Sequence, residues 1–226
     1  MEVYLDNGAT TKVCPEAAEA AVNAMTVCYG NPSSTHTKGR EAKALLDRAR
    51  AQVAAALGAK PEEIVFTSCG SESDNWALIR GAETNRRVGR HIISSAAEHD
   101  AIRKTLEYLE GQGWEVTLLR PGKEGMVTPA QLAEALREDT ALVSLMLVNN
   151  ETGAVTDIPA MRRVLTERGS RALLHTDAVQ VAGKIPVDVK KVPVDMLSMS
   201  GHKFHAPKGI GIFYVRKGTK LKPFML

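Results

Sequence analysis

The stretch AKALLDRARAQVAAALGAKPEEIVFT, residues 42–67, joins a helical pattern to a strand pattern and so decides the fold class. Its apolar positions recur at steps of three and four, which predicts an amphipathic helix ended by Gly58. These positions are Ala42, Leu45, Leu46, Ala49, Val53, Ala56 and Leu57. The largely apolar run 63–67 that follows predicts a strand. A helix followed directly by a strand is the repeating unit of α/β folds.

Further apolar runs continue this alternation towards the C-terminus. Strands are predicted at 92–93, 116–119, 141–148, 172–174, 194–199 and 210–215. Helical patterns lie near 73–82, 99–111, 129–138 and 159–168. Strands that alternate with helices form sheets that are mostly parallel and covered on both faces. We therefore predict an α/β fold with a mostly parallel sheet of about seven strands sandwiched by helices.

Composition and charge indicate a soluble globular protein without a nucleic-acid partner. Hydrophobic residues make up 44% and charged residues 24% of the 226 residues, and the net charge is only +3, from dispersed basic residues. No apolar run approaches membrane-spanning length, and the N-terminus lacks the pattern of a signal peptide. Cys14, Cys28 and Cys69 have no metal-binding spacing and cannot form a complete disulfide set. We expect a cytoplasmic protein with no membrane contact and no metal site.

Ser200-Gly201-His202-Lys203 places a lysine directly after the strand predicted at 194–199. Burial at a strand end lowers the pKa of a lysine, because the charged amine loses its hydration. The neutral amine can then attack a carbonyl or an aldehyde cofactor. The alternative is a solvated loop lysine without a chemical role.

Two more polar segments follow predicted strands, at the edge where open α/β sheets bind their ligands. Residues 68–75 lead into a helix whose free N–H groups suit a phosphate; alternatively, Ser71 or Ser73 caps that helix. His99 could stack on an aromatic ligand or move protons; alternatively, it makes only a local hydrogen bond in a loop.

Amide and carboxyl groups follow two further predicted strands. Asn149-Asn150 offers amide donors or, alternatively, forms a turn. Asp177 is costly to bury unless it meets a cation such as a protonated pyridine nitrogen; the alternative is a carboxylate that caps the next helix. Taken in chain order, the segments could together surround one planar, phosphorylated cofactor.

These segments resemble those of pyridoxal-phosphate-dependent cysteine desulfurases. The likeness rests on Ser200–Lys203 with Ala206–Gly209, Thr176–Gln180, Asn149–Gly153, Glu98-His99 and Ser68–Asn75, and Tyr4–Thr11 and Gly30–Ser34 agree with it. It spans nearly the whole chain and looks most like the NifS/IscS-like branch of the class V aminotransferase superfamily. The resemblance implies the large domain of the fold type I pyridoxal-phosphate-dependent transferases.

The resemblance also implies a role for each site residue. Lys203 would bind pyridoxal 5'-phosphate covalently, Asp177 would pair with the ring nitrogen, and His99 would stack on the ring and assist proton transfer. Gln180 would hydrogen-bond the ring hydroxyl oxygen, and Asn150 would lie by a substrate or cofactor oxygen. The phosphate would be held by Gly70, Ser71, Ser200 and His202.

The activity that the resemblance implies is the conversion of L-cysteine to L-alanine. An enzyme cysteine would take the sulfur as a persulfide and pass it to an iron–sulfur scaffold or another sulfur-acceptor protein, and the enzyme would be a homodimer. None of the three cysteines of this chain matches that sulfur-accepting cysteine. Two alternatives stay open: a related lyase or aminotransferase such as a selenocysteine lyase, and a catalytically inactive partner that binds the cofactor or dimerises.

The domain organisation follows from the same comparison of patterns. Only residues 216–226 follow the last predicted strand. We therefore expect a pyridoxal-phosphate-binding large domain over residues 35–226, without the C-terminal small domain of the family. Residues 1–34 would form an N-terminal segment that in the family packs toward the small domain. A truncated chain of this kind is expected to turn over cysteine poorly by itself.

Overall fold

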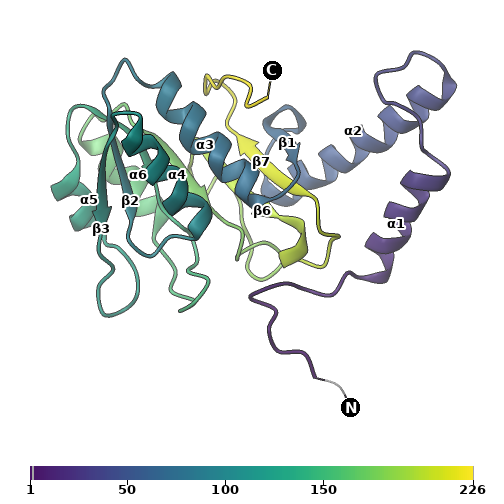
Figure 1. Ribbon diagram of the computed structural model, residues 1–226, viewed down its shortest axis with the longest axis horizontal. Coiled ribbons are helices and arrows are strands. Elements are labelled where there is room, and N and C mark those ends of the chain that lie inside the picture. Colours follow the sequence, from purple (N-terminus) through teal and green to yellow (C-terminus); the bar gives the residue numbers. More distant parts are fainter. Residues whose placement is uncertain (2, 226) are drawn as a thin grey trace.

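Seven strands of the chain form one sheet in the order β1-β7-β6-β5-β4-β2-β3 (Figure 1). This computed structural model describes residue 1 and residues 3–225; Glu2 and Leu226, the last residue of the expected large domain, lie outside it. The strands are β1 (Ile64–Thr67), β2 (His91–Ser95), β3 (Glu115–Leu119), β4 (Thr140–Ser144), β5 (Leu173–Asp177), β6 (Met196–Ser200) and β7 (Gly211–Val215). The helices are α1 (Pro15–Thr26), α2 (Thr37–Leu57), α3 (Gly70–Thr84), α4 (Asp100–Gly111), α5 (Pro129–Ala135) and α6 (Ile158–Glu167).

Strand direction brings the ends of several strands to one edge. β6, β5, β4, β2 and β3 pair in parallel, whereas β7 is antiparallel to both of its neighbours, β6 and β1. β1 therefore runs in the same direction as the parallel strands. The carboxyl ends of β1, β2, β4, β5 and β6 meet at the same edge, where α/β sheets bind ligands. The predicted α/β fold with a mostly parallel seven-stranded sheet is confirmed.

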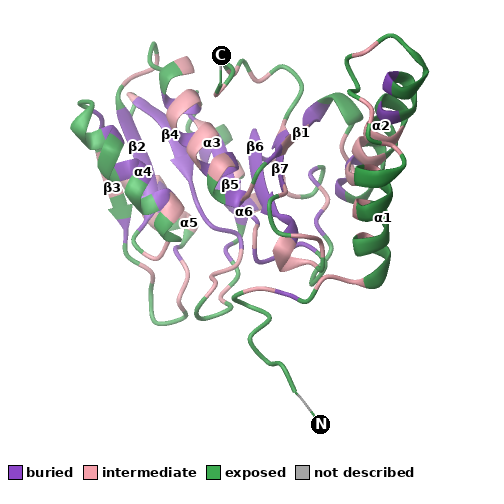
Figure 2. Cartoon of the chain, turned by 45° about the vertical axis from the view of Figure 1, so that its right-hand side comes forward, coloured by how far each residue is buried: buried purple, intermediate pink, exposed green. Residues whose placement is uncertain are grey.

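Helices bury both faces of the central strands, whose successive residues point to opposite faces of the sheet. Ile92, Leu142, Met196 and Phe213 pack with residues of α3 and α4. Ile93, Val143, Leu197 and Ile212 pack with residues of α2, α5 and α6. Figure 2 shows the central strands as the buried centre of the molecule, with the edge strand β3 more exposed. This two-sided burial explains why the strands read as near-continuous apolar runs.

Helix α2 ends as its sequence predicts, and some other elements differ in length. Gly58 adopts a left-handed conformation (φ 67°) at the end of α2, which glycine does without steric cost. The strand expected at 172–174 continues to Asp177, so its polar residues belong to the ladder with β6. The helix expected at 129–138 ends at Ala135, because Leu136 adopts an extended conformation.

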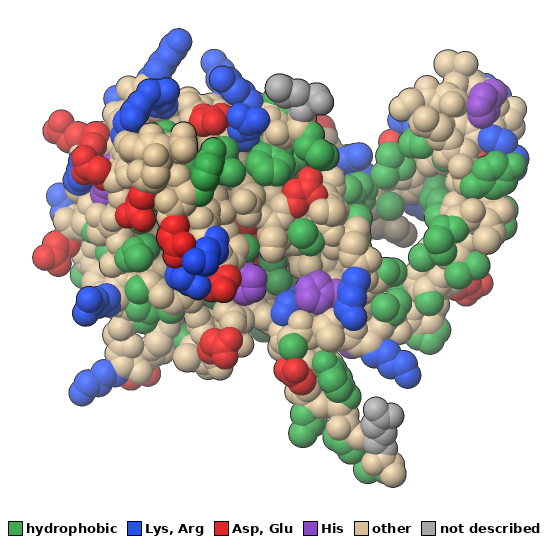
Figure 3. Space-filling model, in the orientation of Figure 1, with side chains coloured by type: hydrophobic (Ala, Val, Ile, Leu, Met, Phe, Trp, Pro, Cys, Tyr) green, Lys and Arg blue, Asp and Glu red, His purple; other side chains and the backbone are tan. Residues whose placement is uncertain are grey.

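The N-terminal segment behaves differently from the sheet. Its helix α1 begins at Pro15 and has no buried residue. Val22, Met25, Val27 and Tyr29 are large, apolar or aromatic, and exposed. Figure 3 shows hydrophobic side chains along the surface of this part of the molecule. Among the described residues, no helix combines the length and the apolar character needed to cross a membrane.

Candidate functional site

A cavity of about 240 Å³ lies at the carboxyl edge of the sheet. The nine residues predicted as site residues all line it: Gly70, Ser71, His99, Asn150, Asp177, Gln180, Ser200, His202 and Lys203. Five residues without a predicted role also line it: Ala9, Cys69, Asp74, Met146 and Val179. The structure thus brings together groups that lie up to 133 positions apart between Gly70 and Lys203.

One wall of the cavity is the N-terminus of α3. A Cβ atom on Gly70 would lie 2.8 Å from Cγ2 of Val179 and 3.3 Å from Cβ of Ser200, so only glycine lets the helix begin this close to β6. In the described chain, the side chain of the N-cap residue, Cys69, makes no capping hydrogen bond. The Ser73 hydroxyl donates to the carbonyl oxygen of Cys69 and, among the described residues, does not accept a backbone N–H group. The capping alternative is therefore wrong for Ser73. Uncapped N–H groups and the positive end of the helix dipole suit an anion.

Lys203 lies in the short 3₁₀ turn η2 (Gly201–Lys203) that directly follows β6. Its Nζ atom donates hydrogen bonds to the carbonyl oxygens of Gly8 and Ala9, the latter at 2.9 Å. Burial and the nearby charge of Lys184 lower the pKa of the Lys203 amine below its ordinary value. Lys203 is thus half-buried rather than fully solvated, and its lowered pKa shifts the amine toward the neutral, nucleophilic form.

The N-terminal segment covers the site through polar contacts that the sequence patterns did not predict. The Gly8 carbonyl also accepts a hydrogen bond from Gln180 Nε2 at 3.0 Å. Nδ1 of His202 lies 3.1 Å from the Thr10 hydroxyl. Burial, followed by the charge of Lys203, lowers the pKa of His202. The segment therefore forms part of the cavity wall, and Ala9 is one of its lining residues.

His99 and Asn150 line the cavity from the ends of β2 and β4. His99 is the N-cap of α4, and its Nδ1 accepts the Ala101 N–H at 3.1 Å. His99 therefore makes the local hydrogen bond of the alternative interpretation and also lines the cavity. The turn alternative describes Asn149, whose Oδ1 accepts the N–H groups of Glu151 and Thr152. Asn150 is the asparagine of this pair that reaches the cavity.

Asp177 is the last residue of β5 and is only 3% exposed. Its Oδ1 accepts the Val179 N–H at 2.8 Å, so the carboxylate also orders the turn after the strand, as the capping alternative expects. Burial raises the pKa of Asp177, while the Val179 N–H, His99 and Lys203 act in the opposite direction. A cation in the cavity would stabilise its charged form.

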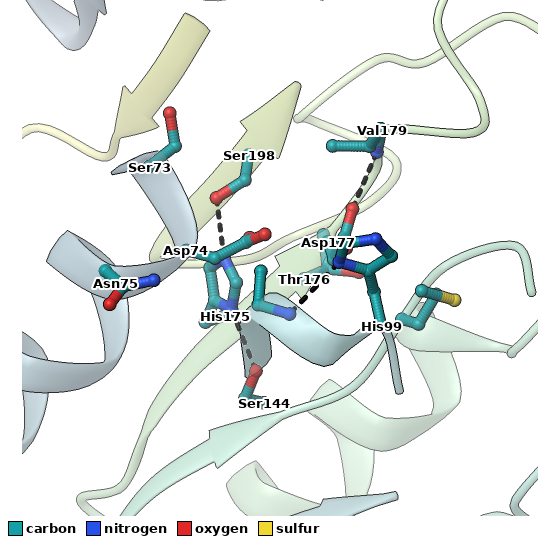
Figure 4. A network of polar contacts seen from close by, with 12 residues as sticks. Ser73, Asp74, Asn75, His99, Ser144, His175, Thr176, Asp177, Val179 and Ser198 are labelled. Carbon is teal, nitrogen blue, oxygen red and sulfur yellow. Dashed lines mark hydrogen bonds and ion pairs between the residues drawn. The ribbon is translucent and has the colours of Figure 1, made fainter. Parts of the chain in front are cut away.

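A buried polar network lies beside Asp177 and was missed in the sequence (Figure 4). His175 on β5 bonds the hydroxyls of Ser144 and Ser198, both at 2.9 Å, and lies 3.7 Å from Oδ1 of Asp74. Burial lowers the pKa of His175 to about 3, so the ring is neutral. Asp74 could have been found, since it follows Gly70 by four residues and hence lies on the same face of α3.

The donor set fits a planar phosphorylated cofactor that carries a basic ring nitrogen. An anion-binding helix end, a carboxylate and a lysine of lowered pKa face one cavity, and the close approach at Gly70 keeps the helix end against it. In the part of the chain that the structure describes, no three His, Cys, Asp or Glu residues gather as metal ligands.

Comparisons with known proteins agree with this geometry. Residues 3–226 match the family model of the class V aminotransferases. The cysteine desulfurase IscS of Methanosarcina thermophila is 48% identical over 223 residues, which cover 99% of this chain and 55% of that protein. A solved NifS-like protein is 42% identical with a TM-score of 0.96, covering 100% of this chain and 62% of that chain. A structure of SspA in complex with cysteine is 37% identical with a TM-score of 0.93, covering 99% of this chain and 65% of that chain. The chain thus spans little more than half the length of the curated relatives it matches.

Proposed function

The chain belongs to the class V aminotransferase family, whose cofactor is pyridoxal phosphate, and we propose that it is the cofactor-binding portion of a cysteine desulfurase. One observation carries this proposal: the nine residues that the resemblance assigns to the cofactor all line a single cavity. Its relatives are named cysteine desulfurases, and one related structure contains cysteine. These similarities support L-cysteine as the substrate.

Each proposed role uses a property that the structure gives to the residue. The N-terminus of α3 and the side chains of Ser71, Ser200 and His202 would bind the phosphate. Asp177 would hold a positive ring nitrogen, because a buried carboxylate is stabilised by a cation.

The remaining roles concern the reacting end of the site. Pyridoxal phosphate, when bound, supplies an electron-withdrawing ring that weakens the bonds around the α-carbon of an amino acid. Lys203 would hold the cofactor and, once its contacts with Gly8 and Ala9 are broken, move a proton. His99 would stack on the ring, Gln180 would bond its hydroxyl oxygen, and Asn150 would lie beside the substrate.

The organisation of the whole protein is also a proposal. Residues 1–34 would pack toward a smaller domain of the kind that the family resemblance implies, and residues 35–226 would form the cofactor-binding domain. The exposed apolar face of α1 supports this arrangement. The resemblance supports a homodimer and transfer of sulfur to an iron–sulfur scaffold or another acceptor, and the sequence patterns support a cytoplasmic location.

Cofactor binding is tested with the purified 226-residue chain and pyridoxal phosphate. We expect a visible absorption band, and after reduction with borohydride a cofactor adduct on the peptide that contains Lys203. Lys203→Ala should abolish both. Lys184→Ala is the matched control, because Lys184 is an exposed lysine whose charge acts on Lys203. Adducts that survive in Lys203→Ala would contradict the assignment.

Turnover is tested by the release of sulfide from L-cysteine in the presence of a thiol. We expect little release from these 226 residues alone, because Cys14, Cys28 and Cys69 do not match the sulfur-accepting cysteine of the family. Cys69 lies in the cavity wall beside the phosphate end. Rapid release that depends on Lys203 would show that this expectation is wrong. Faster release of selenide from L-selenocysteine would favour the lyase alternative.

A further inference from the structure

Asp74 is a buried carboxyl in the cavity wall for which the proposed function gives no role. It lies in the second turn of α3, is 1% exposed, and lines the same cavity as Asp177. Within the described residues, its Oδ1 atom is buried and has no hydrogen-bond partner. In Figure 4 the Asp74 carboxyl lies beside the His175 ring, on the side of Asp177. A buried, unpartnered polar atom in a cavity wall points to a function there.

The groups around Asp74 offer no positive charge. Among the described residues, only the nearby Ser198 hydroxyl, which bonds His175 Nε2, favours the ionised form of Asp74, whereas Asp177, Glu98 and Cys69 all disfavour it. His175 lies 3.7 Å away, but its burial keeps the ring neutral down to about pH 3. An ionised Asp74 would therefore be an uncompensated buried charge, which is far more costly than a buried neutral acid.

Asp177 has a different set of neighbours. Its carboxylate accepts the Val179 N–H at 2.8 Å, and His99 and Lys203 both favour its ionised form. Burial raises the pKa of both aspartates, and the two carboxyl groups repel each other. When two neighbouring carboxyls disfavour each other's charge, the proton stays on the group with the weaker support for its charge. Here that group is Asp74.

We propose that Asp74 is a positioning residue that stays a neutral carboxylic acid in the cavity wall and leaves Asp177 as the single charged carboxylate facing the cofactor. The part that concerns the cofactor rests on the proposed function. A neutral Asp74 can approach Asp177 without repulsion and turn its own O–H group into the cavity. Asp177 would then offer a single negative charge to the ring nitrogen of pyridoxal phosphate, and Asp74 would add none.

Infrared spectroscopy of the cofactor-free protein tests the protonation directly. A protein labelled with ¹³C in its aspartate carboxyls should show, at neutral pH, a protonated-acid band that shifts with the label. Asp74→Asn should lose this band and Asp177→Asn should keep it. Glu98→Gln is the matched control, since Glu98 is another enclosed carboxyl of raised pKa but is not an aspartate. The proposal is overturned if no labelled band is present, or if Asp177→Asn removes it.

Addition of pyridoxal phosphate to the unsubstituted labelled protein gives a second measurement that needs no variant to fold. The band should persist in the complex, because Asp74 keeps its proton. A band that vanishes on binding would place the proton on Asp177 in the free protein and would overturn the proposal. Failure to bind pyridoxal phosphate would count against the proposed function only, because the spectra of the cofactor-free protein decide the protonation of Asp74 independently.

Conservative rescue separates a neutral acid from a merely space-filling residue. Asp74→Ala should weaken cofactor binding by about tenfold, through loss of a buried polar group beside Asp177. Asp74→Asn, which has the shape of the neutral acid, should recover most of that loss. Circular dichroism should confirm that both variants are folded. An Asp74→Asn protein that binds as weakly as Asp74→Ala would overturn the proposal.

Discussion

The cavity wall and the N-terminal segment lie side by side but are held by different kinds of contact. The wall is built from strand ends and the start of α3, where Asp74, His175 and Asp177 are almost fully buried. The N-terminal segment contributes α1, which has no fully buried residue, and it is attached by hydrogen bonds such as those from Thr11 to His202. Burial thus determines the electrostatics of the wall, whereas hydrogen bonds help to hold the segment over it.

Stability and function therefore depend on different kinds of contact in the two regions. In the cavity wall, burial on folding shifts the pKa of a polar group. The free energy of unfolding therefore depends on the protonation state of that group. In the N-terminal segment, a hydrogen bond can break without exposing the hydrophobic core of the sheet to water. Lys203 belongs to both regions, since its pKa is lowered by burial while its amine bonds the Gly8 and Ala9 carbonyls.

The largest expected effect is a pH-dependent loss of stability caused by His175. Its pKa is about 3 in the folded protein and 6.5 in the unfolded chain. Between these values the unfolded chain binds a proton that the folded protein does not, so stability is complete above pH 6.5 and falls as the pH drops. At about 1.4 kcal/mol per pH unit, the loss reaches on the order of 5 kcal/mol near pH 3.

Urea unfolding at a series of pH values measures this loss. The buried acids Asp74 and Asp177 act in the opposite direction, because their raised pKa values favour the folded state at low pH. The comparison is therefore made with His175→Gln, which cannot titrate. We expect the unfolding free energy of the variant to depend less steeply on pH between 3 and 6.5. Equal slopes for the two proteins would contradict a neutral, buried His175.

A smaller effect separates apolar residues of the sheet from those of α1. Phe213 on β7 is fully buried and packs against Trp76, with ring centroids 5.3 Å apart. Phe213→Ala should lower the free energy of unfolding by about 3–5 kcal/mol, through lost burial and a cavity. Met25→Ala on α1 should change it by less than about 0.5 kcal/mol, because Met25 is 69% exposed. A large loss in Met25→Ala would show that α1 is covered in solution.

Sequence patterns predicted the sheet well because two-sided burial leaves a local mark. Runs such as 63–67 and 210–215 are apolar and short, and each forms a strand close to its expected bounds. Helix α1 left no comparable mark, because none of its residues is buried and its large apolar side chains, Val22 and Met25, are exposed. The antiparallel direction of β7 also has no local signature, since direction depends on the connection from η2.

For the site, the sequence predicted residue types at strand ends but not their contacts. The sequence predicted Gly70, Asp177 and Lys203 as site residues. Each follows an apolar strand pattern, and its residue type is not one that a buried strand requires. The contact between Lys203 and Gly8 joins residues 195 positions apart, and no pattern within either segment indicates it. Asp74 was missed because an acidic residue in a helix is usually solvated, and only the packing of α3 on the sheet buries it.

The smallest expected effect concerns the attachment of the N-terminal segment. The Thr11 hydroxyl donates to the His202 carbonyl at 2.8 Å and accepts the His205 N–H at 2.7 Å. Thr11→Val removes both contacts at similar volume, at a cost of about 1–2 kcal/mol that is confined to the segment. Hydrogen exchange at the Thr11 and Cys14 amides, which bond η2 and His205, should therefore accelerate by about tenfold. Thr26→Val is the control, because the Thr26 hydroxyl bonds only Val22 within α1. If both variants left these amides equally protected, polar contacts would not be what attaches the segment to the site.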